Sequence, residues 1–336
     1  MSVVSTLRLN MTGHAARPED EAKRYRAAID MAAYADANGF GAIGLEEHHC
    51  AENGWLPSPL LMAGMIAART DNVQINVTAL LITLYDPIRL AEDIAVLDLS
   101  SAGRFNFVAG LGYRPEEYHA LGKDWGNRGK RMDETIETLL TAWRGEPFEY
   151  KGQTIRVTPV PASRPHPPFF IGGMSKAAAR RAARFALPFF PPMPIPELEA
   201  LYYQEVQARG HAGNPNCFVY DISSQNTMLF VDPEPDRAWE ELGPFFLREL
   251  QEYAGWKRDG VKRPLEDNVG SVEDLRKQGR FAILTPAQCL ERLSAEGDHV
   301  AVLHPLAGGV PVDRAWNSLR LYVDNVLKPL KAIINT

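Results

Sequence analysis

Residues 41–54 read GAIGLEEHHCAENG, a short apolar run that leads into two carboxylates and two histidines and stops at an Asn-Gly turn. The apolar residues are compatible with a strand, so residues 46–49 (EEHH) fall at or beyond its carboxyl end. In α/β folds this end of a strand is where chemistry is placed. Because side chains alternate along a strand, His48 and His49 are expected to point in opposite directions, and only one of them easily faces a shared pocket.

Strand-like and helix-like segments alternate on both sides of this stretch. Apolar and β-branched runs predict eight strands, near residues 5, 43, 76, 107, 170, 188, 225 and 301. Nearly all of them precede segments with helical spacing, and a short hairpin is expected around Lys151-Gly152. This alternation is the pattern of a (β/α)₈ TIM barrel. A doubly wound sheet is the alternative, disfavoured because no GxGxxG motif opens the first helix.

The length of 336 residues suits one large barrel, and we expect a single domain over residues 1–336. Residues 255–279 carry many charges and glycines and little periodicity, which predicts a mobile insertion. Such an insertion is expected to cover the active site as a lid.

Composition excludes several classes of partner. A formal net charge of −6 and a pI near 5.8 argue against nucleic acid, which calls for clustered Lys and Arg. Three scattered cysteines, Cys50, Cys217 and Cys289, favour a reducing, cytoplasmic compartment. No apolar run approaches the roughly 18 residues that span a bilayer, and no secretory leader opens the chain, so no membrane association is expected.

Glu47 and His48 are candidates for an acid/base pair, because a carboxylate beside an imidazole fixes its tautomer. A hydrogen-bonded strand end is the alternative interpretation. A metal site is disfavoured, because adjacent ligands point to opposite faces of a strand and the helical HExxH spacing is absent. His304, at the end of the last strand, is a second candidate pocket histidine, with hydrogen bonding in the core or a loop as its expected role.

Residues 172–175 (GGMS) come directly before an alanine-rich helix. Glycines allow the backbone to approach an oxyanion, and Ser175 can both cap the helix and donate a hydroxyl, so an anion site and an ordinary N-cap are both open. The glycines in residues 104–112 likewise leave two interpretations open: a backbone that a flat ligand can approach, or plain turns. Residues 128–131, with three cations, favour either a phosphate contact or a solvated helix face.

Several segments together resemble the bacterial luciferase-like flavin monooxygenases. The resemblance runs in order over nearly the whole chain, and its most specific parts are LEEHH, DPIRLAEDIAVLD followed by SAGRF, and FALP after the alanine-rich helix. It implies a (β/α)₈ barrel, in agreement with the strand count.

The resemblance also implies roles for individual residues. His48 matches the family's active-site histidine beside the flavin, and Thr78-Ala79 matches a non-proline cis peptide against which the isoalloxazine lies. Ser175, with the Met174 and Ser175 backbone amides, matches the flavin phosphate site, and Gly173 beside them is a further candidate cofactor-binding residue.

Two departures from the family pattern are informative. Gly110 and Leu111 occupy the positions of a reactive cysteine and a phosphate-binding arginine in the luciferase catalytic subunit, so light emission is not expected. The phosphate then needs another cation, for which Arg114 and Arg131 are our hypotheses. Met174 replaces a phosphate-site glutamate, and the loss of this negative charge keeps a deazaflavin cofactor open.

The resemblance predicts a monooxygenase that uses reduced FMN, supplied by a separate flavin reductase, and O₂ to oxygenate a small organic substrate. His48 would direct the transfer of a proton, and Glu47 would orient the His48 ring. A deazaflavin (coenzyme F420)-dependent hydride transferase is the alternative, and a non-catalytic flavin-binding or partner subunit is the second alternative.

Two further expectations concern the pocket and the assembly. Aromatic residues are expected to line an apolar cavity, namely Trp55, Phe105, Tyr113 and Phe190. A homodimer formed through helices early in the barrel is also expected from the resemblance.

Overall fold

A computed structural model describes residues 2–13, 17–220, 227–256, 269–295 and 298–334. Its strands form a nine-stranded sheet in the order β10-β9-β11-β1-β2-β3-β4-β7-β8, and every strand pair in it is parallel. The strands are β1 (Ser2–Leu9), β2 (Ala42–Leu45), β3 (Gln74–Leu80), β4 (Phe105–Ala109), β7 (Phe169–Gly172), β8 (Phe189–Phe190), β9 (Met228–Val231), β10 (Phe281–Leu284) and β11 (Asp298–Leu303).

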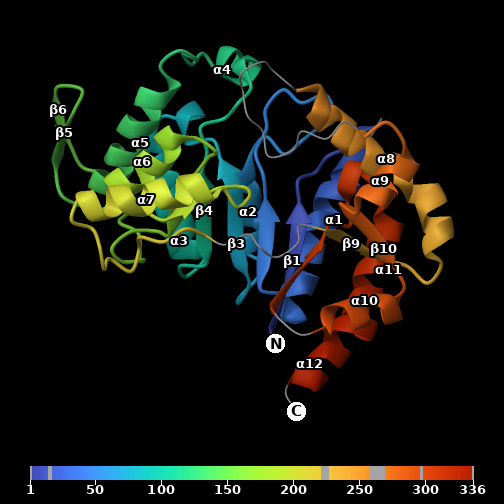
Figure 1. Cartoon of the computed structure of the whole chain (residues 1–336). Coiled ribbons are helices and arrows are strands. Elements are labelled where there is room, and N and C mark those ends of the chain that lie inside the picture. The colour runs from blue at the N-terminus through green and yellow to red at the C-terminus, as the bar shows by residue number, and fades with distance from the viewer. Residues whose placement is uncertain (1, 14–16, 221–226, 257–268, 296–297, 335–336) are drawn as a thin grey trace.

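Helices flank the central strands on both sides (Figure 1). They are α1 (Pro18–Ala37), α2 (Pro59–Ala67), α3 (Pro87–Ser100), α4 (Pro115–Ala120), α5 (Arg128–Ala142), α6 (Lys176–Arg184), α7 (Pro196–Ala208), α8 (Pro235–Gly255), α9 (Val272–Gln278), α10 (Pro286–Leu293), α11 (Val312–Tyr322) and α12 (Lys328–Ile334). Short 3₁₀ turns lie at η1 (Ile82–Leu84) and η2 (Ala307–Gly309), and a π-helical turn, η3 (Val323–Leu327), joins α11 to α12. Several helices begin with proline, whose missing N–H costs nothing in the first turn.

The predicted α/β barrel architecture is confirmed, because a parallel sheet with a helix after most strands is what the alternation demands. Beyond β8 the sheet continues through a parallel bridge from Phe189 to Val219. The seventh strand was predicted near residue 225, and residues 221–226 lie outside the described residues. The strand that the structure describes in this region is β9. The hairpin is confirmed as β5 (Phe148–Tyr150) and β6 (Gln153–Ile155).

Three features differ from the sequence-based expectation. β10 is a ninth strand that was not predicted, since a run of only four apolar residues is too short for its periodicity to distinguish a strand from a helix. The expected insertion at 255–279 contains a helix that was not predicted, α9, which is capped by Ser271 and ended by Gly279 with φ of 73°. Residues 257–268 of this expected insertion lie outside the described residues. The loop expected after β4 contains α4, which begins at Pro115.

The barrel core is built from the strands' apolar side chains. The rings of Phe107 and Phe169, on the neighbouring strands β4 and β7, stack 5.0 Å apart and are fully buried. The parallel register brings the carboxyl ends of the strands to one edge, uppermost in Figure 1, where the loops after β1 to β4 and β7 meet. No helix in the described part of the chain is long and apolar enough to cross a membrane.

Candidate active site

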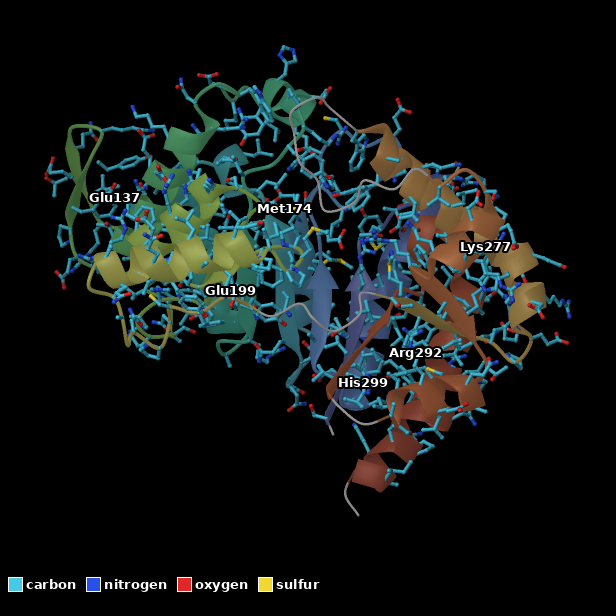
Figure 2. The ribbon with its side chains drawn as sticks, in the orientation of Figure 1. Glu137, Met174, Glu199, Lys277, Arg292 and His299 are labelled. Carbon is cyan, nitrogen blue, oxygen red and sulfur yellow. The ribbon has the colours of Figure 1, made fainter. Side chains whose placement is uncertain are left out.

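A cavity of about 1180 Å³ opens at the carboxyl ends of the strands. It is of the size that cofactor and substrate sites occupy. Eight of the ten predicted site residues line it: Glu47, His48, Thr78, Ala79, Gly110, Gly173, Met174 and Ser175. Figure 2 shows Met174 at the upper end of the strands, between the green and orange halves of the molecule.

One wall of the cavity is a flat backbone surface at the end of β3. The Thr78-Ala79 peptide bond is cis, as the family resemblance predicts. Gly110, at the end of β4, lies against it, and its N–H donates to the Leu80 carbonyl at 2.8 Å. A Cβ added at Gly110 would lie 2.8 Å from the Cβ of Ala79, closer than such atoms approach. The glycine is therefore required by this close packing.

The opposite end of the cavity is formed by the start of α6. Ser175 is the N-cap, and its Oγ accepts a hydrogen bond from the Ala178 N–H at 3.2 Å, so the predicted cap is confirmed. Two cations border this end. Arg128 lies with its guanidinium 3.7 Å from the ring centre of Trp125, and Lys176 has no ion-pair partner among the described residues. Arg128 Nη1 also donates to the Trp125 carbonyl at 2.8 Å, but both cations line the cavity. A helix N-terminus beside two cations favours an anion.

Arg114 and Arg131, our hypotheses for the phosphate cation, do not face the cavity. Arg131 donates from Nε and Nη2 to the carbonyl oxygens of Thr83 and Tyr85. Arg114 is buried and donates to the His49 carbonyl at 2.7 Å, with its guanidinium 4.1 Å from the ring centre of Trp256. Neither arginine lines the cavity, because backbone oxygens hold these guanidinium groups in place.

His48 lies at the other side of the flat wall and makes a hydrogen bond from each ring nitrogen. Its Nδ1 is 2.9 Å from Oε1 of Glu117, and its Nε2 is 3.0 Å from the Tyr113 hydroxyl. Burial and the neighbouring Tyr253 raise the pKa of Tyr113 well above its usual value, so its hydroxyl keeps its proton. This arrangement places the histidine proton on Nδ1, where it is donated to Glu117, and leaves Nε2 to accept from Tyr113.

Glu47 does not orient His48, contrary to our prediction. Its Oε1 is 3.0 Å from Nε2 of His49 and accepts the Tyr85 hydroxyl at 2.5 Å, while its Oε2 accepts the Leu81 N–H. Strand alternation explains the difference, because Glu47 and His49 share one direction and His48 takes the other. Glu47 therefore anchors the loops after β2 and β3.

Sequence reasoning missed the carboxylate that does hold His48. Glu117 is fully buried in α4, and its Oε1 also receives the His49 N–H at 3.0 Å and Arg114 Nη1 at 3.2 Å. The one available signal was an acidic pair directly after Arg114-Pro115, which predicts a helix start but not which glutamate turns inward.

A second buried network borders the cavity, where Glu249 of α8, one of the lining residues, meets His304. Nε2 of His304 is 3.1 Å from Oε2 of Glu249, and Nδ1 is 3.1 Å from the Arg8 carbonyl, so the core role predicted for His304 is confirmed. The Glu249 carboxylate also accepts from Asn10 and Thr12. Burial alone would raise the pKa of Glu249, but His304, Arg8 and Thr12 together hold it well below its ordinary value of 4.5.

Three of the four predicted aromatic residues line the cavity, namely Trp55, Tyr113 and Phe190. Phe105 does not, because it lies in the core with its ring 6.0 Å from that of Phe107. Within the described ranges, no three His, Cys, Asp or Glu side chains converge as a metal site would require.

Comparison with known proteins shows to which family the chain belongs. The family model for luciferase-like monooxygenases matches residues 4–299. The chain belongs to this family. An uncharacterised protein of Sinorhizobium fredii, y4wF, is 34% identical over 302 residues, covering 87% of this chain and 88% of that protein. The alkanal monooxygenase alpha chain of Photorhabdus luminescens is 26% identical, covering 87% and 88%.

Other matches in this luciferase-like group name particular reactions. The oxygenase component of a flavin-dependent trigonelline monooxygenase from Acinetobacter baylyi is 27% identical, over 49% of this chain and 48% of that protein. The oxygenating constituent of 3,6-diketocamphane monooxygenase from Pseudomonas putida, solved with FMN, has a TM-score of 0.68 at 19% identity, covering 98% and 99%. An F420-dependent secondary alcohol dehydrogenase has a TM-score of 0.63 at 15% identity, covering 97% and 98%. These two structures support the fold alone.

Proposed function

We propose that this luciferase-like protein is the oxygenase component of a flavin-dependent monooxygenase that uses reduced FMN and O₂ to oxygenate a small organic substrate. One oxygen atom enters the substrate and the other leaves as water, with both electrons coming from reduced FMN. The observation that carries the proposal is that the Thr78-Ala79 peptide, Gly110 and His48 line one cavity, with the His48 ring held by Glu117.

The residues fit the cofactor on two counts. The close approach of Gly110 to Ala79 leaves a flat surface without a side chain, as a planar ring needs. The start of α6, with Ser175, Arg128 and Lys176, supplies the donors and positive charge that a phosphate needs. Arg128 and Lys176 thus take the place of the arginine that Leu111 replaces.

His48 holds a proton relay at the edge of this wall. The Glu117 carboxylate accepts from Nδ1 and fixes the ring, and Nε2 accepts a hydrogen bond from the Tyr113 hydroxyl. A histidine with one nitrogen held in this way is suited to general acid–base work at the other. Trp55, whose ring lies 5.0 Å from that of His48, helps to exclude water from the site.

We further propose that a separate reductase supplies reduced FMN, as the designation of the trigonelline enzyme as an oxygenase component suggests.

A homodimer is proposed through α2 and α3. These helices pack together and expose apolar side chains that a monomer would not favour, at Leu61 (67% exposed), Met65 (36%), Val96 (52%) and Leu99 (45%). The whole chain is proposed to act as one catalytic domain.

A test mixes the protein and photoreduced FMN with O₂, using decanal, trigonelline and 3,6-diketocamphane as substrates and ¹⁸O₂ as the label. Incorporation of one labelled atom into any product, lost in His48→Ala while FMN affinity stays within about threefold, supports the proposal. Failure to bind reduced FMN contradicts it, as does unchanged turnover in His48→Ala.

Coenzyme F420-dependent hydride transfer is the second candidate. The observation favouring it is the cation pair beside α6, with Met174 at the position where a glutamate would repel a longer anionic tail. Anaerobic turnover with reduced F420 of a secondary alcohol's ketone, and none with reduced FMN and O₂, would establish it in place of oxygenation.

A further inference from the structure

Arg8 and Glu46 form a fork-shaped ion pair on the cavity wall. Nε of Arg8 donates to Oε1 of Glu46 at 2.5 Å, and Nη2 donates to Oε2 at 3.0 Å. Both side chains line the cavity, and about one fifth of each is exposed, 20% and 21%. A bidentate pair of this kind has a rigid, planar shape.

The other side of the Arg8 guanidinium contacts two further residues that line the cavity, Met228 and Glu249. Nη1 donates to the Met228 sulfur at 2.7 Å and approaches Glu249 at 3.5 Å. A guanidinium has five N–H groups, so one N–H on Nη2 has no acceptor among the described residues. Oε2 of Glu46 accepts only the Arg8 bond there and has a lone pair left. The pair thus offers one donor and one acceptor side by side.

This donor and acceptor lie next to the flat wall. Leu45 pairs with Val77 in the β2–β3 register, so Glu46 follows beside Thr78 of the cis peptide. Arg8 pairs with Gly44 in the β1–β2 register. A planar ring resting on Thr78-Ala79 would therefore have its edge toward the Arg8–Glu46 pair.

We infer that the Arg8–Glu46 pair binds the edge of a cyclic imide or amide, in which an N–H stands next to a C=O. Nη2–H donates to the carbonyl, and Oε2 of Glu46 accepts the N–H. A free carboxylate would meet Glu46 and Glu249, and an ammonium group would meet Arg8, whereas a neutral edge meets no like charge. The inference rests on the flavin binding of the proposed function, and not on its oxygen chemistry.

Two ligands carry this chemistry, the pyrimidine edge of the flavin ring and a substrate with an imide or lactam group. The flavin arm compares FMN with 3-methyl-FMN, which lacks the N–H, by fluorescence titration of the unaltered protein. We expect 3-methyl-FMN to bind at least about tenfold more weakly, as for the loss of a charge-assisted hydrogen bond.

The double variant Arg8→Met/Glu46→Leu removes both charges together, so that neither is left unpaired. In this variant the affinity ratio of the two flavins should fall to about one. The control is Arg237→Met/Glu234→Leu, which removes an exposed ion pair of 3.2 Å and should keep the ratio of the unaltered protein. A ratio that persists in the cavity variant excludes the flavin edge as the ligand of the pair, and it overturns the inference if the glutarimide preference described below is absent or also persists in that variant. The comparison in the unaltered protein stands even if the variant does not fold.

The substrate arm saturates the protein with FMN and measures binding of glutarimide and N-methylglutarimide by ligand-observed NMR. Binding of glutarimide alone, lost in the cavity variant, assigns the pair to the substrate. If neither flavin nor glutarimide is distinguished from its methylated form, the inference is overturned. Failure of oxygenation with intact discrimination between the flavins would contradict the proposed reaction and leave the inference standing.

Discussion

Nδ1 of His48 lies 2.9 Å from Oε1 of Glu117, a residue 69 positions further along the chain. The loop after β2 and the helix α4 that follows β4 thus meet over the cavity, and their contact sets the orientation of the candidate catalytic histidine. Three donors converge on this one carboxylate oxygen, from His48, the His49 backbone and Arg114. The carboxylate is therefore held as firmly as the ring it orients.

Glu117→Gln should lower turnover about tenfold or more, because the amide no longer specifies which nitrogen of His48 carries the proton. FMN affinity should change by less than about threefold, since Glu117 does not line the cavity. The measurement is kcat together with a flavin titration. Glu116→Gln, at the exposed neighbouring glutamate, is the control and should leave both values unchanged. Equal loss in the two variants would refute the role of Glu117.

Gly110→Ala should weaken FMN binding at least about tenfold, because its Cβ would lie 2.8 Å from Ala79 and push the flat wall out of shape. Flavin affinity by fluorescence titration, with thermal unfolding alongside, measures the effect. Among the described residues no atom lies within 4 Å of a Cβ added at Gly255, so Gly255→Ala is the matched control. Unaltered FMN affinity in Gly110→Ala would show that the cofactor does not rest on this surface.

Arg128→Ala should weaken FMN binding about tenfold and leave riboflavin binding nearly unchanged, because riboflavin lacks the phosphate. The two flavins are compared by titration at constant ionic strength. Lys130→Ala, two residues along α5 and exposed, removes the same charge away from the cavity and should affect neither flavin. A similar loss for riboflavin would assign Arg128 to folding instead of phosphate binding.

Leu61→Asp should shift the protein toward monomer, because it places a charge in the apolar face of α2 and α3. Sedimentation velocity over a range of concentrations measures the change. Leu121→Asp alters an exposed leucine (41%) outside these helices and should leave the mass unchanged. A monomeric unaltered protein would rule out the proposed dimer.

Glu249→Gln should lower the free energy of unfolding by about 3 to 5 kcal/mol at pH 7, because His304 is left without its charged partner. The pKa of Glu249 is lower in the folded protein, so its contribution is complete above its ordinary value of 4.5 and is lost as the pH falls toward the folded-state pKa. Urea unfolding should therefore show a smaller difference in the free energy of unfolding between the variant and the unaltered protein at pH 4 than at pH 7. Glu240→Gln, at an exposed position of the same helix, should show no gap at either pH.

Much of the fold follows from local pattern. The β-branched runs, the Asn-Gly turns and the prolines at helix starts are properties of neighbouring residues, so they identify the barrel and most of its helices. β10 and α9 were missed because four apolar residues and one short charged helix carry little periodicity of their own. Packing against α8 decides their conformation instead.

For the candidate site, the amino-acid sequence alone determined which strand ends carry polar groups. EEHH after β2, GGMS before α6 and the Thr78-Ala79 step all lie at the cavity, because the carboxyl ends of parallel strands must share one edge. Which groups touch across that edge was decided only by the tertiary structure. Alternation turns Glu47 toward His49, so the partner of His48 comes from α4, while backbone oxygens far along the chain hold Arg114 and Arg131 away from the cavity. Such contacts depend on how separate loops fold over one another, and the spacing of residues within one loop does not encode them.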